Sequence, residues 1–218
     1  DRRSMLRKKV QKGNLVVAPS VFEMVSAKVA DRMGFDALYM TGYGTVASYL
    51  GLPDAGLASY SDMVNRVSQF ASITQTPMIC DGDTGYGGLL NVMHTVRGYE
   101  NAGACVIQLE DQEMPKKCGH TPGRRVIPAD EAALKIRVAA EARKDPNFLI
   151  VARTDARTTL HNAKRSNDGA CINHRSRIDH CAWVNTFRSS RWQTAFPQTG
   201  QSGKVHIRIG RHNARATL

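Results

Sequence analysis

Four acidic residues follow two apolar segments of the chain, at the points where those segments end. Asp81 and Asp83 follow one segment directly, and Glu110 and Asp111 follow the next one along the chain. Neighbouring strands lie about 4.8 Å apart, so these carboxylates would converge if both segments were parallel strands of one sheet. Like charges at such a distance are costly without a cation. Oxygen ligands in small number suit Mg²⁺, and the alternative is a set of surface acids that cap helices.

A cysteine lies among basic residues in a loop punctuated by glycine and proline. The loop contains Lys116-Lys117-Cys118-Gly119-His120. Two lysines and a histidine beside a thiol favour its thiolate, which makes Cys118 a candidate general acid or nucleophile. The alternative interpretation is a loop cysteine without a chemical role.

Two other places could bind an anion. Arg153 and Asp155 follow a fifth apolar segment, and an arginine there could hold a substrate carboxylate through two parallel hydrogen bonds. An ion pair between these two residues is the alternative. The turn Thr41-Gly42-Tyr43-Gly44 offers backbone N–H groups that could also hold an anion.

Short apolar runs alternate with amphipathic stretches over the first 160 residues. Strands are predicted at residues 14–22, 37–41, 77–80, 105–109 and 148–152. Helices are predicted at residues 23–33, 61–73, 91–101 and 129–144. Five such repeats predict an α/β fold with a parallel sheet and helical crossovers. Active sites in such folds lie at the carboxyl ends of the strands, where the polar residues gather.

The chain divides into three parts: a basic N-terminal segment (1–13), the repeating part (14–160) and an aperiodic tail (161–218). The net charge of +11 invites a nucleic-acid-binding interpretation. Residues 1–160 carry 20 Lys and Arg against 17 Asp and Glu, a net of +3, whereas the last 58 residues carry 10 against 2, a net of +8. Most of the excess charge therefore belongs to the tail, and nucleic-acid binding is not predicted for the repeating part.

The tail has little helix or strand periodicity, and a strand is predicted only at residues 205–209. Its compositional break favours the hypothesis of an out-of-frame reading beyond codon 160, which sequencing of the coding DNA tests. A second hypothesis is nucleic-acid binding through stacking of the aromatic residues Trp183, Phe187, Trp192 and Phe196. A zinc site is disfavoured because the spacing of the tail's Cys and His residues matches no standard finger. Without further barrel units the repeating part would expose strand edges, so we expect low stability and little activity.

Composition favours a cytoplasmic location. The chain is 42% hydrophobic, contains no apolar run of about 18 residues that predicts a membrane span, and shows no secretory signal. Five cysteines at irregular spacing are not typical of a disulfide framework.

Six ordered motifs together resemble the isocitrate lyase and phosphoenolpyruvate mutase superfamily over about residues 14–160. The resemblance implies a (β/α)8 TIM-type barrel of which the first five βα units are recognisable. The Lys-Lys-Cys-Gly-His loop resembles the lyase branch, such as 2-methylisocitrate and 2,3-dimethylmalate lyases. The motifs are Tyr39-Met40-Thr41-Gly42, Gly51-Leu52-Pro53-Asp54, Asp81-Gly82-Asp83-Thr84-Gly85-Tyr86-Gly87, Leu109-Glu110-Asp111-Gln112, Lys116-Lys117-Cys118-Gly119-His120 and Ala152-Arg153-Thr154-Asp155-Ala156.

The resemblance also implies the role of each site residue. Asp83 would coordinate Mg²⁺ (or Mn²⁺) most directly, with Asp81 and Glu110 acting through water. The residues implied in substrate binding are Tyr39, Thr41, Gly42, Tyr43, Asp54 and Gly119. The residues implied in catalysis are Cys118, Arg153 and His120.

The implied reaction is cleavage of a 2-hydroxy di- or tricarboxylic acid to a 2-oxo acid and a second carboxylate. Mg²⁺ would polarise the substrate oxygens, and Cys118 would protonate the carbanion left by the broken C2–C3 bond. The alternative within the family is a phosphonate-type mutase, such as phosphoenolpyruvate or carboxyphosphonoenolpyruvate mutase. The expected partners are a small carboxylic acid and further copies of the chain, with no membrane.

Overall fold

The computed structural model describes residues 1–119, 121–159, 181–185 and 207–210. Its helices are α1 (Arg2–Gln11), α2 (Met24–Asp31), α3 (Gly42–Leu50), α4 (Tyr60–Ile73), α5 (Leu89–Asn101), α6 (Ala129–Ala142) and α7 (Ala156–Thr159). Its strands are β1 (Val16–Val21), β2 (Leu38–Met40), β3 (Met78–Asp81), β4 (Val106–Glu110), β5 (Leu149–Thr154), β6 (Cys181–Asn185) and β7 (Ile207–Gly210).

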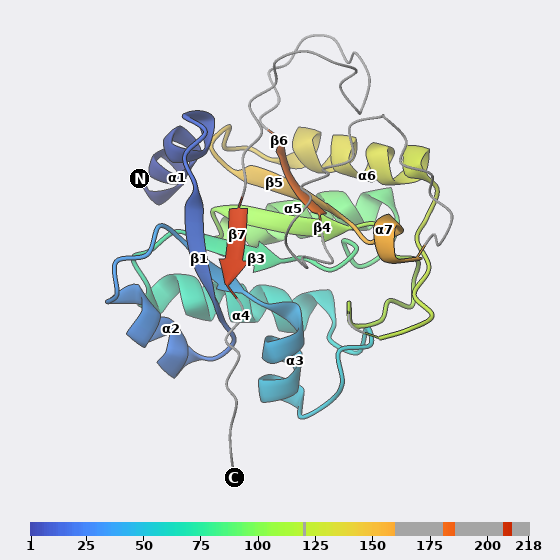
Figure 1. Cartoon of the computed structure of the whole chain (residues 1–218), viewed down its shortest axis with the longest axis horizontal. Helices are drawn as coiled ribbons and strands as arrows, with labels where there is room; N and C mark the ends of the chain where they lie inside the picture. Colours follow the sequence, from blue (N-terminus) through green and yellow to red (C-terminus); the bar gives the residue numbers. More distant parts are fainter. Residues whose placement is uncertain (120, 160–180, 186–206, 211–218) are drawn as a thin grey trace.

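The strands form one sheet in the order β6-β5-β4-β3-β2-β1-β7 (Figure 1). Strands β1 to β5 are parallel neighbours in chain order, which confirms the predicted parallel sheet with helical crossovers. Strand β7 pairs with β1 in parallel and overlaps the strand predicted at residues 205–209, whereas β6, which pairs antiparallel with β5, was not predicted. The two tail strands therefore extend the sheet beyond β5 and β1, and among the described residues β6 and β7 become its outer strands.

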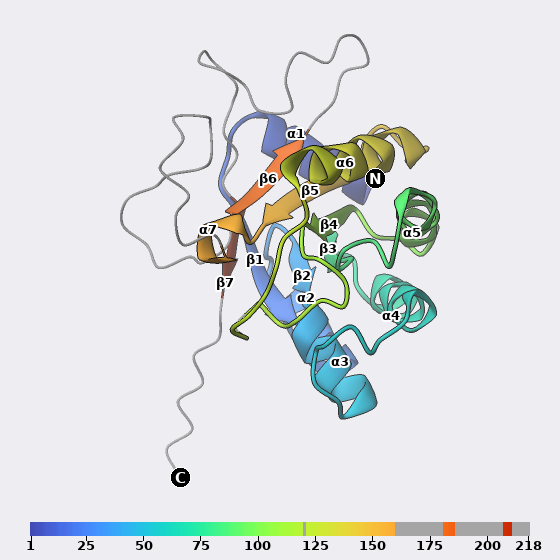
Figure 2. The same cartoon turned by 90° about the vertical axis from the view of Figure 1, so that its right-hand side faces the viewer.

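Helices α4, α5 and α6 lie along the same side of the sheet (Figure 2). Because side chains alternate across a strand, the strands contribute apolar side chains to two separate clusters, one on each face of the sheet. The outward-facing cluster includes Leu38, Met78 and Ile107 and packs under the helices. The inward-facing cluster includes Ile79, Val106, Val151 and the α1 residues Leu6 and Val10. This alternation decides which residues at the strand tips face the barrel interior.

The basic segment at the N-terminus is a helix that was not predicted. Asp1 caps α1 by accepting a hydrogen bond from the Arg3 backbone N–H at 3.1 Å. Arg2 donates to the Thr74 carbonyl at 2.7 Å, and the Arg3 Nε donates to the Ala104 carbonyl at 2.9 Å. Both carbonyls lie just before the amino ends of strands β3 and β4. The basic residues of α1 thus bind the sheet at the end opposite the acidic residues.

Helix α3 starts where the sequence predicted a turn. Thr41 is its N-cap in an extended conformation, and Gly42 and Gly44 lie in its first turn. A Cβ at Gly44 would lie 2.6 Å from the Cβ of Phe22, so close packing on the β1–α2 connection requires glycine here. The helix N-terminus therefore points its N–H groups toward the carboxyl end of the sheet. In the described part of the chain, no helix is long and apolar enough to cross a membrane.

Candidate active site

Three of the predicted site residues lie on the inner face at the tips of adjacent strands. Asp81 is two residues beyond the inward-facing Ile79, and Glu110 and Arg153 continue the inward-facing rows of β4 and β5. The strand register pairs Glu110 directly with Arg153. The sheet thus gathers these side chains at one place, which the sequence predicted for the carboxylates of Asp81 and Glu110.

Asp81 lies in a cage of donors. Its Oδ2 accepts hydrogen bonds from the Gly42 N–H at 3.2 Å and from the Tyr39 hydroxyl at 3.3 Å, and its Oδ1 accepts from the Asp83 N–H at 3.0 Å. A Cβ at Gly42 would lie 2.9 Å from this Oδ2, so the contact requires glycine. Thr41 adjoins this cage as the helix cap, whereas the Tyr43 side chain is exposed. Tyr39 and Gly42 therefore contact the acidic cluster, and Tyr43 does not contribute its side chain.

Asp83 and Asp54 share one cation. The Lys116 Nζ lies 2.5 Å from the Oδ1 of Asp83 and 2.5 Å from the Oδ1 of Asp54, and all three side chains are at least nine-tenths buried. Burial raises the pKa of Asp83 to about 6, although Lys116 opposes the change. The surrounding carboxylates raise the pKa of Lys116 against the effect of its burial. Lys116 is therefore the resident counter-ion of the cluster.

Arg153 binds two carboxylates. Its guanidinium lies 3.0 Å from the Glu110 Oε2 and 3.2 Å from the Asp155 Oδ2. Burial raises the pKa of Glu110 to about 8, Arg153 lowers it, and Asp81 raises it further. The ion pair between Arg153 and Asp155, which the sequence left as an alternative, is present.

The loop that carries Cys118 crosses the carboxyl end of the strands. At one end Lys116 reaches Asp83. At the other end the Gly119 carbonyl accepts a hydrogen bond from Arg124, which also pairs with Asp155 at 3.4 Å. Cys118 lies between these two anchors and is partly exposed. His120, a predicted catalytic residue, lies outside the described residues.

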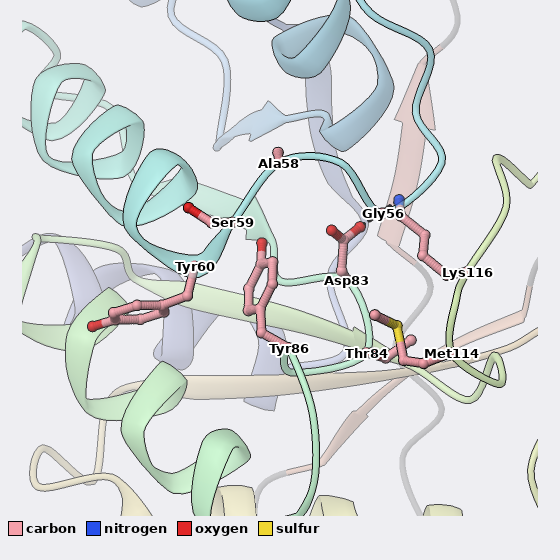
Figure 3. A pocket seen from close by; sticks show the side chains of 9 residues that line it. All are labelled: Gly56, Ala58, Ser59, Tyr60, Asp83, Thr84, Tyr86, Met114 and Lys116. Carbon is pink, nitrogen blue, oxygen red and sulfur yellow. Dashed lines mark ion pairs between the residues drawn. The ribbon is translucent and has the colours of Figure 1, made fainter.

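A cavity of about 270 Å³ adjoins the cluster (Figure 3). Asp83 and Tyr86 project toward the segment that carries Gly56 and Ala58, and Lys116 closes one side. Asp83 and Tyr86 both have positive φ angles, 49° and 59°. Left-handed backbone is costly for residues with a side chain and is often found at functional sites.

Comparison with known proteins identifies the family. The family model described as "Phosphoenolpyruvate phosphomutase" matches residues 6–173, more than half of the chain. The chain is 51% identical over 154 residues to the 2,3-dimethylmalate lyase of Eubacterium barkeri, covering 71% of this chain and 53% of the relative. The chain belongs to the phosphoenolpyruvate mutase and isocitrate lyase superfamily. The predicted lyase-branch resemblance is confirmed.

Other superfamily members show the same relation. The chain is 46% identical to the 2-methylisocitrate lyase of Aeropyrum pernix, covering 70% of this chain and 49% of the relative. A structure of oxaloacetate acetylhydrolase with 3,3-difluorooxalacetate superposes with a TM-score of 0.69 at 39% identity, covering 72% of this chain and 55% of that one. A phosphonopyruvate hydrolase complex with oxalate and Mg²⁺ has a TM-score of 0.65 at 34% identity, covering 71% and 53%. The chain thus spans about half the length of the relatives it matches.

The acidic cluster fits a magnesium ion by the chemistry of its donors. Asp81, Asp83 and Glu110 offer only oxygen, and Mg²⁺ takes one or two carboxylates directly and completes its shell with water and substrate. Within the described residues, no three His, Cys, Asp or Glu side chains are arranged as ready ligands. Lys116 and Arg153 supply the compensating charge instead. A divalent ion at this point would replace part of that charge.

The pKa values of the cluster predict how stability depends on pH. Because the folded-state pKa values of Asp83 and Glu110 are raised, their contribution to stability is fully present below about pH 4 and is lost as the pH rises through about 6 and 8. Without divalent metal, we expect the unfolding temperature of the Glu110→Gln variant to fall less between pH 5 and 8.5 than that of the wild type. Equal slopes in thermal melts of the two proteins would contradict this expectation.

Sequence reasoning missed two residues that organise the site. Lys116 was interpreted as a neighbour of the thiol, but its ammonium group lies against Asp54, 62 residues away in the chain. Gln112 received no role, although its side chain is buried beside Glu110. Both residues stand inside the family motifs, which was the only available signal.

Proposed function

We propose that the protein contributes the metal- and substrate-binding half of a Mg²⁺-dependent carbon–carbon lyase. The substrate would be a 2-hydroxy di- or tricarboxylic acid of the dimethylmalate or 2-methylisocitrate type. The main observation in support is that Asp81, Asp83 and Glu110 converge at adjacent strand tips beside Arg153, with the loop of Cys118 across them. The similarity to a 2,3-dimethylmalate lyase supports this choice of substrate class.

Substrate carboxylates would bind to the N–H groups at the start of α3 and to the Arg153 guanidinium. Arg153 is oriented for this task because Glu110 and Asp155 hold it on two sides. The Tyr39 hydroxyl would keep Asp81 in place at the metal side of the pocket. These residues fix the substrate before any bond changes, which lowers the entropic part of the barrier.

When bound, Mg²⁺ would polarise the substrate's hydroxyl and carboxylate oxygens. The hydroxyl would give its proton to a carboxylate of the cluster of Asp81, Asp83 and Glu110. The C2–C3 electron pair would then leave with C3, and C2 would become the carbonyl of a 2-oxo acid. Cys118 would give its proton to the C3 carbanion as general acid. The loop between Lys116 and Gly119 would exclude water from that carbanion.

A phosphonate-type mutase is the second candidate, because the family model carries that description. The Lys116-Lys117-Cys118-Gly119 segment favours the lyase. We further propose a cytoplasmic location and assembly with other copies of the chain. Nucleic-acid binding by the tail is a separate hypothesis; of the aromatic residues that it names, Trp183 lies in β6 and the others lie outside the described residues.

The test is an assay of the whole chain and of a chimera whose residues beyond Leu160 come from the 2,3-dimethylmalate lyase of Eubacterium barkeri. Both are incubated with Mg²⁺ and 2,3-dimethylmalate, 2-methylisocitrate, isocitrate, oxaloacetate or phosphonopyruvate. Loss of the added substrate and formation of 2-oxo acid products are both measured. We expect the chimera to cleave at least one 2-hydroxy acid and to stop when Mg²⁺ is chelated. We expect much less turnover from the whole chain, which spans about half of its relatives. Conversion of phosphonopyruvate alone would favour the mutase, and no conversion at all would contradict both.

A further inference from the structure

Gln112 has a buried side-chain amide that lies between the strand-tip carboxylates and the loop of Cys118. It lies two residues beyond β4 and is 2% exposed. Its backbone forms an isolated antiparallel bridge with Val126. Flanking hydrogen bonds join the Glu113 N–H to the Arg125 carbonyl and the Ile127 N–H to the Asp111 carbonyl, both at 2.9 Å. The base of the Cys118 loop is thereby closed, and Gln112 sits at that base.

The Gln112 side chain holds the backbone of the residue before the thiol. Its Oε1 accepts a hydrogen bond from the Lys117 N–H at 3.1 Å, and its Nε2 donates to the Lys117 carbonyl at 3.0 Å. Both main-chain groups of Lys117 are thus bound by one side chain. The position of Cys118, one bond further along, depends on this contact.

The same amide contacts the substrate and metal sides of the site. Its Nε2 lies 3.0 Å from the Glu110 Oε1 and 3.0 Å from the Asp155 Oδ2. Glu110 and Asp155 are the two carboxylates that hold Arg153. The amide is oriented by its surroundings, because the opposite orientation would place its oxygen against both carboxylates.

An amide nitrogen carries two hydrogens, yet three acceptors surround this one. The carbonyl of Lys117 therefore shares donors with Glu110 and Asp155. Any change that engages the Glu110 oxygen elsewhere leaves more of the amide's donor capacity to the Lys117 carbonyl. The loop would then be held more firmly.

We propose that Gln112 is a positioning residue for the Cys118 thiol. How firmly it holds the loop depends on how strongly Glu110 and Asp155 compete with the Lys117 carbonyl for its two amide hydrogens. The inference rests on the proposed function for its catalytic meaning, but its structural content can be tested without turnover. The measured quantity is the rate at which iodoacetamide alkylates Cys118 in the whole chain, followed by peptide mass mapping.

The Gln112→Leu variant is expected to be alkylated at Cys118 about tenfold faster, the factor that corresponds to about 1.4 kcal/mol of lost tethering. Gln112→Glu should behave similarly, because it keeps the acceptor but loses the donor and adds a charge beside two carboxylates. Cys80 and Cys105, both buried, report global unfolding in the same digest. Added Mg²⁺ should slow Cys118 alkylation in the wild type more than in Gln112→Leu.

Gln108→Leu is the matched control. Gln108 is also a buried glutamine and lies within β4, but its Nε2 donates to the Tyr39 hydroxyl at 2.8 Å, away from the loop. Cys118 alkylation should be unchanged in this variant. Equal acceleration in both leucine variants, or wild-type rates in Gln112→Leu with Cys80 and Cys105 protected, would overturn the proposal.

One measurement uses only the wild-type protein, so it remains possible even if the Gln112 variants do not fold. Hydrogen exchange of the Lys117 amide in the wild type should be slowed although its side chain is exposed, because the N–H donates to a buried acceptor. Exchange at the rate of an unstructured peptide would overturn the proposal. Loss of lyase activity in the chimera assay would bear on the function alone, since neither readout here uses turnover.

Discussion

Replacing Lys116 with methionine is expected to lower the free energy of unfolding by about 3–5 kcal/mol at pH 8. The ammonium is the cation that lies against both Asp54 and Asp83, and these carboxylates are buried. Methionine has a similar unbranched shape, so the loss measures charge rather than packing. Urea unfolding followed by circular dichroism gives the value. At pH 5 the loss should shrink, because Asp83, with its raised pKa, can take a proton.

Two variants separate this effect from general damage to the loop. Lys117→Met removes an exposed ammonium next in the chain, which donates to the Gly123 carbonyl at 3.2 Å, and it should stay within about 0.5 kcal/mol of the wild type. Lys116→Met combined with Asp83→Asn should recover part of the lost stability, because the second change removes one uncompensated charge. A Lys116→Met protein as stable as the wild type would show that the buried pair does not exist in solution.

Competition between Lys116 and a divalent ion follows from the same geometry. An ammonium within 2.5 Å of the Asp83 Oδ1 occupies space and charge that Mg²⁺ would use. Metal binding at Asp83 would therefore displace the Lys116 side chain toward Asp54 or the substrate. Lys116 stands only two residues before the thiol of Cys118, so the loop would be affected as well. If the proposed metal binds there, the position of the loop, the occupancy of the metal site and the charge of the substrate would be linked through the Lys116 side chain.

The strands were predictable because their signal is local. Residues such as Met78, Ile79 and Cys80 form a short apolar run, and the acidic residue that follows marks its end. Period-two alternation then fixes which face Asp81 takes. The sequence therefore predicted the gathering of carboxylates without any knowledge of distant contacts.

The helices α1 and α3 were missed because tertiary contacts outweigh their local sequence. Helix α1 buries only Leu6 and Val10, and its arginines bind carbonyls that lie about 70 and 100 residues away in the chain. Helix α3 begins with two glycines, which are poor helix formers, because Asp81 and Phe22 leave no room for a larger residue. Neither reason can be found within a window of neighbouring residues.

Two long-range polar contacts of the site were missed for the same reason. The Lys116 contact with Asp54 joins positions 62 residues apart, and the Gln112 contact with Asp155 joins positions 43 apart. Sequence spacing shows which side chains stand at strand tips, but it does not show which of them pair. The pairs determine which residues are available to a metal or a substrate.

The Cys118→Ser substitution is expected to lower the kcat of the lyase chimera by about 10²–10⁴-fold, the usual contribution of a positioned general acid. A serine hydroxyl occupies nearly the same place but is a far weaker acid than a thiol, so protonation of the carbanion would be slower. The KM should change little, because Arg153 and the start of α3 bind the substrate in this scheme.

The matched control is Cys105→Ala, which removes another thiol at the amino end of β4, opposite the site. It should leave kcat within a few-fold of the unsubstituted chimera. Binding of oxalate with Mg²⁺, followed by calorimetry, should persist in Cys118→Ser, since none of the proposed ligands is changed. If Cys118→Ser kept its turnover, the proton would have to come from elsewhere, and the loop would act only as a cover. If it lost oxalate binding as well, Cys118 would belong to the binding surface rather than to the proton-transfer step.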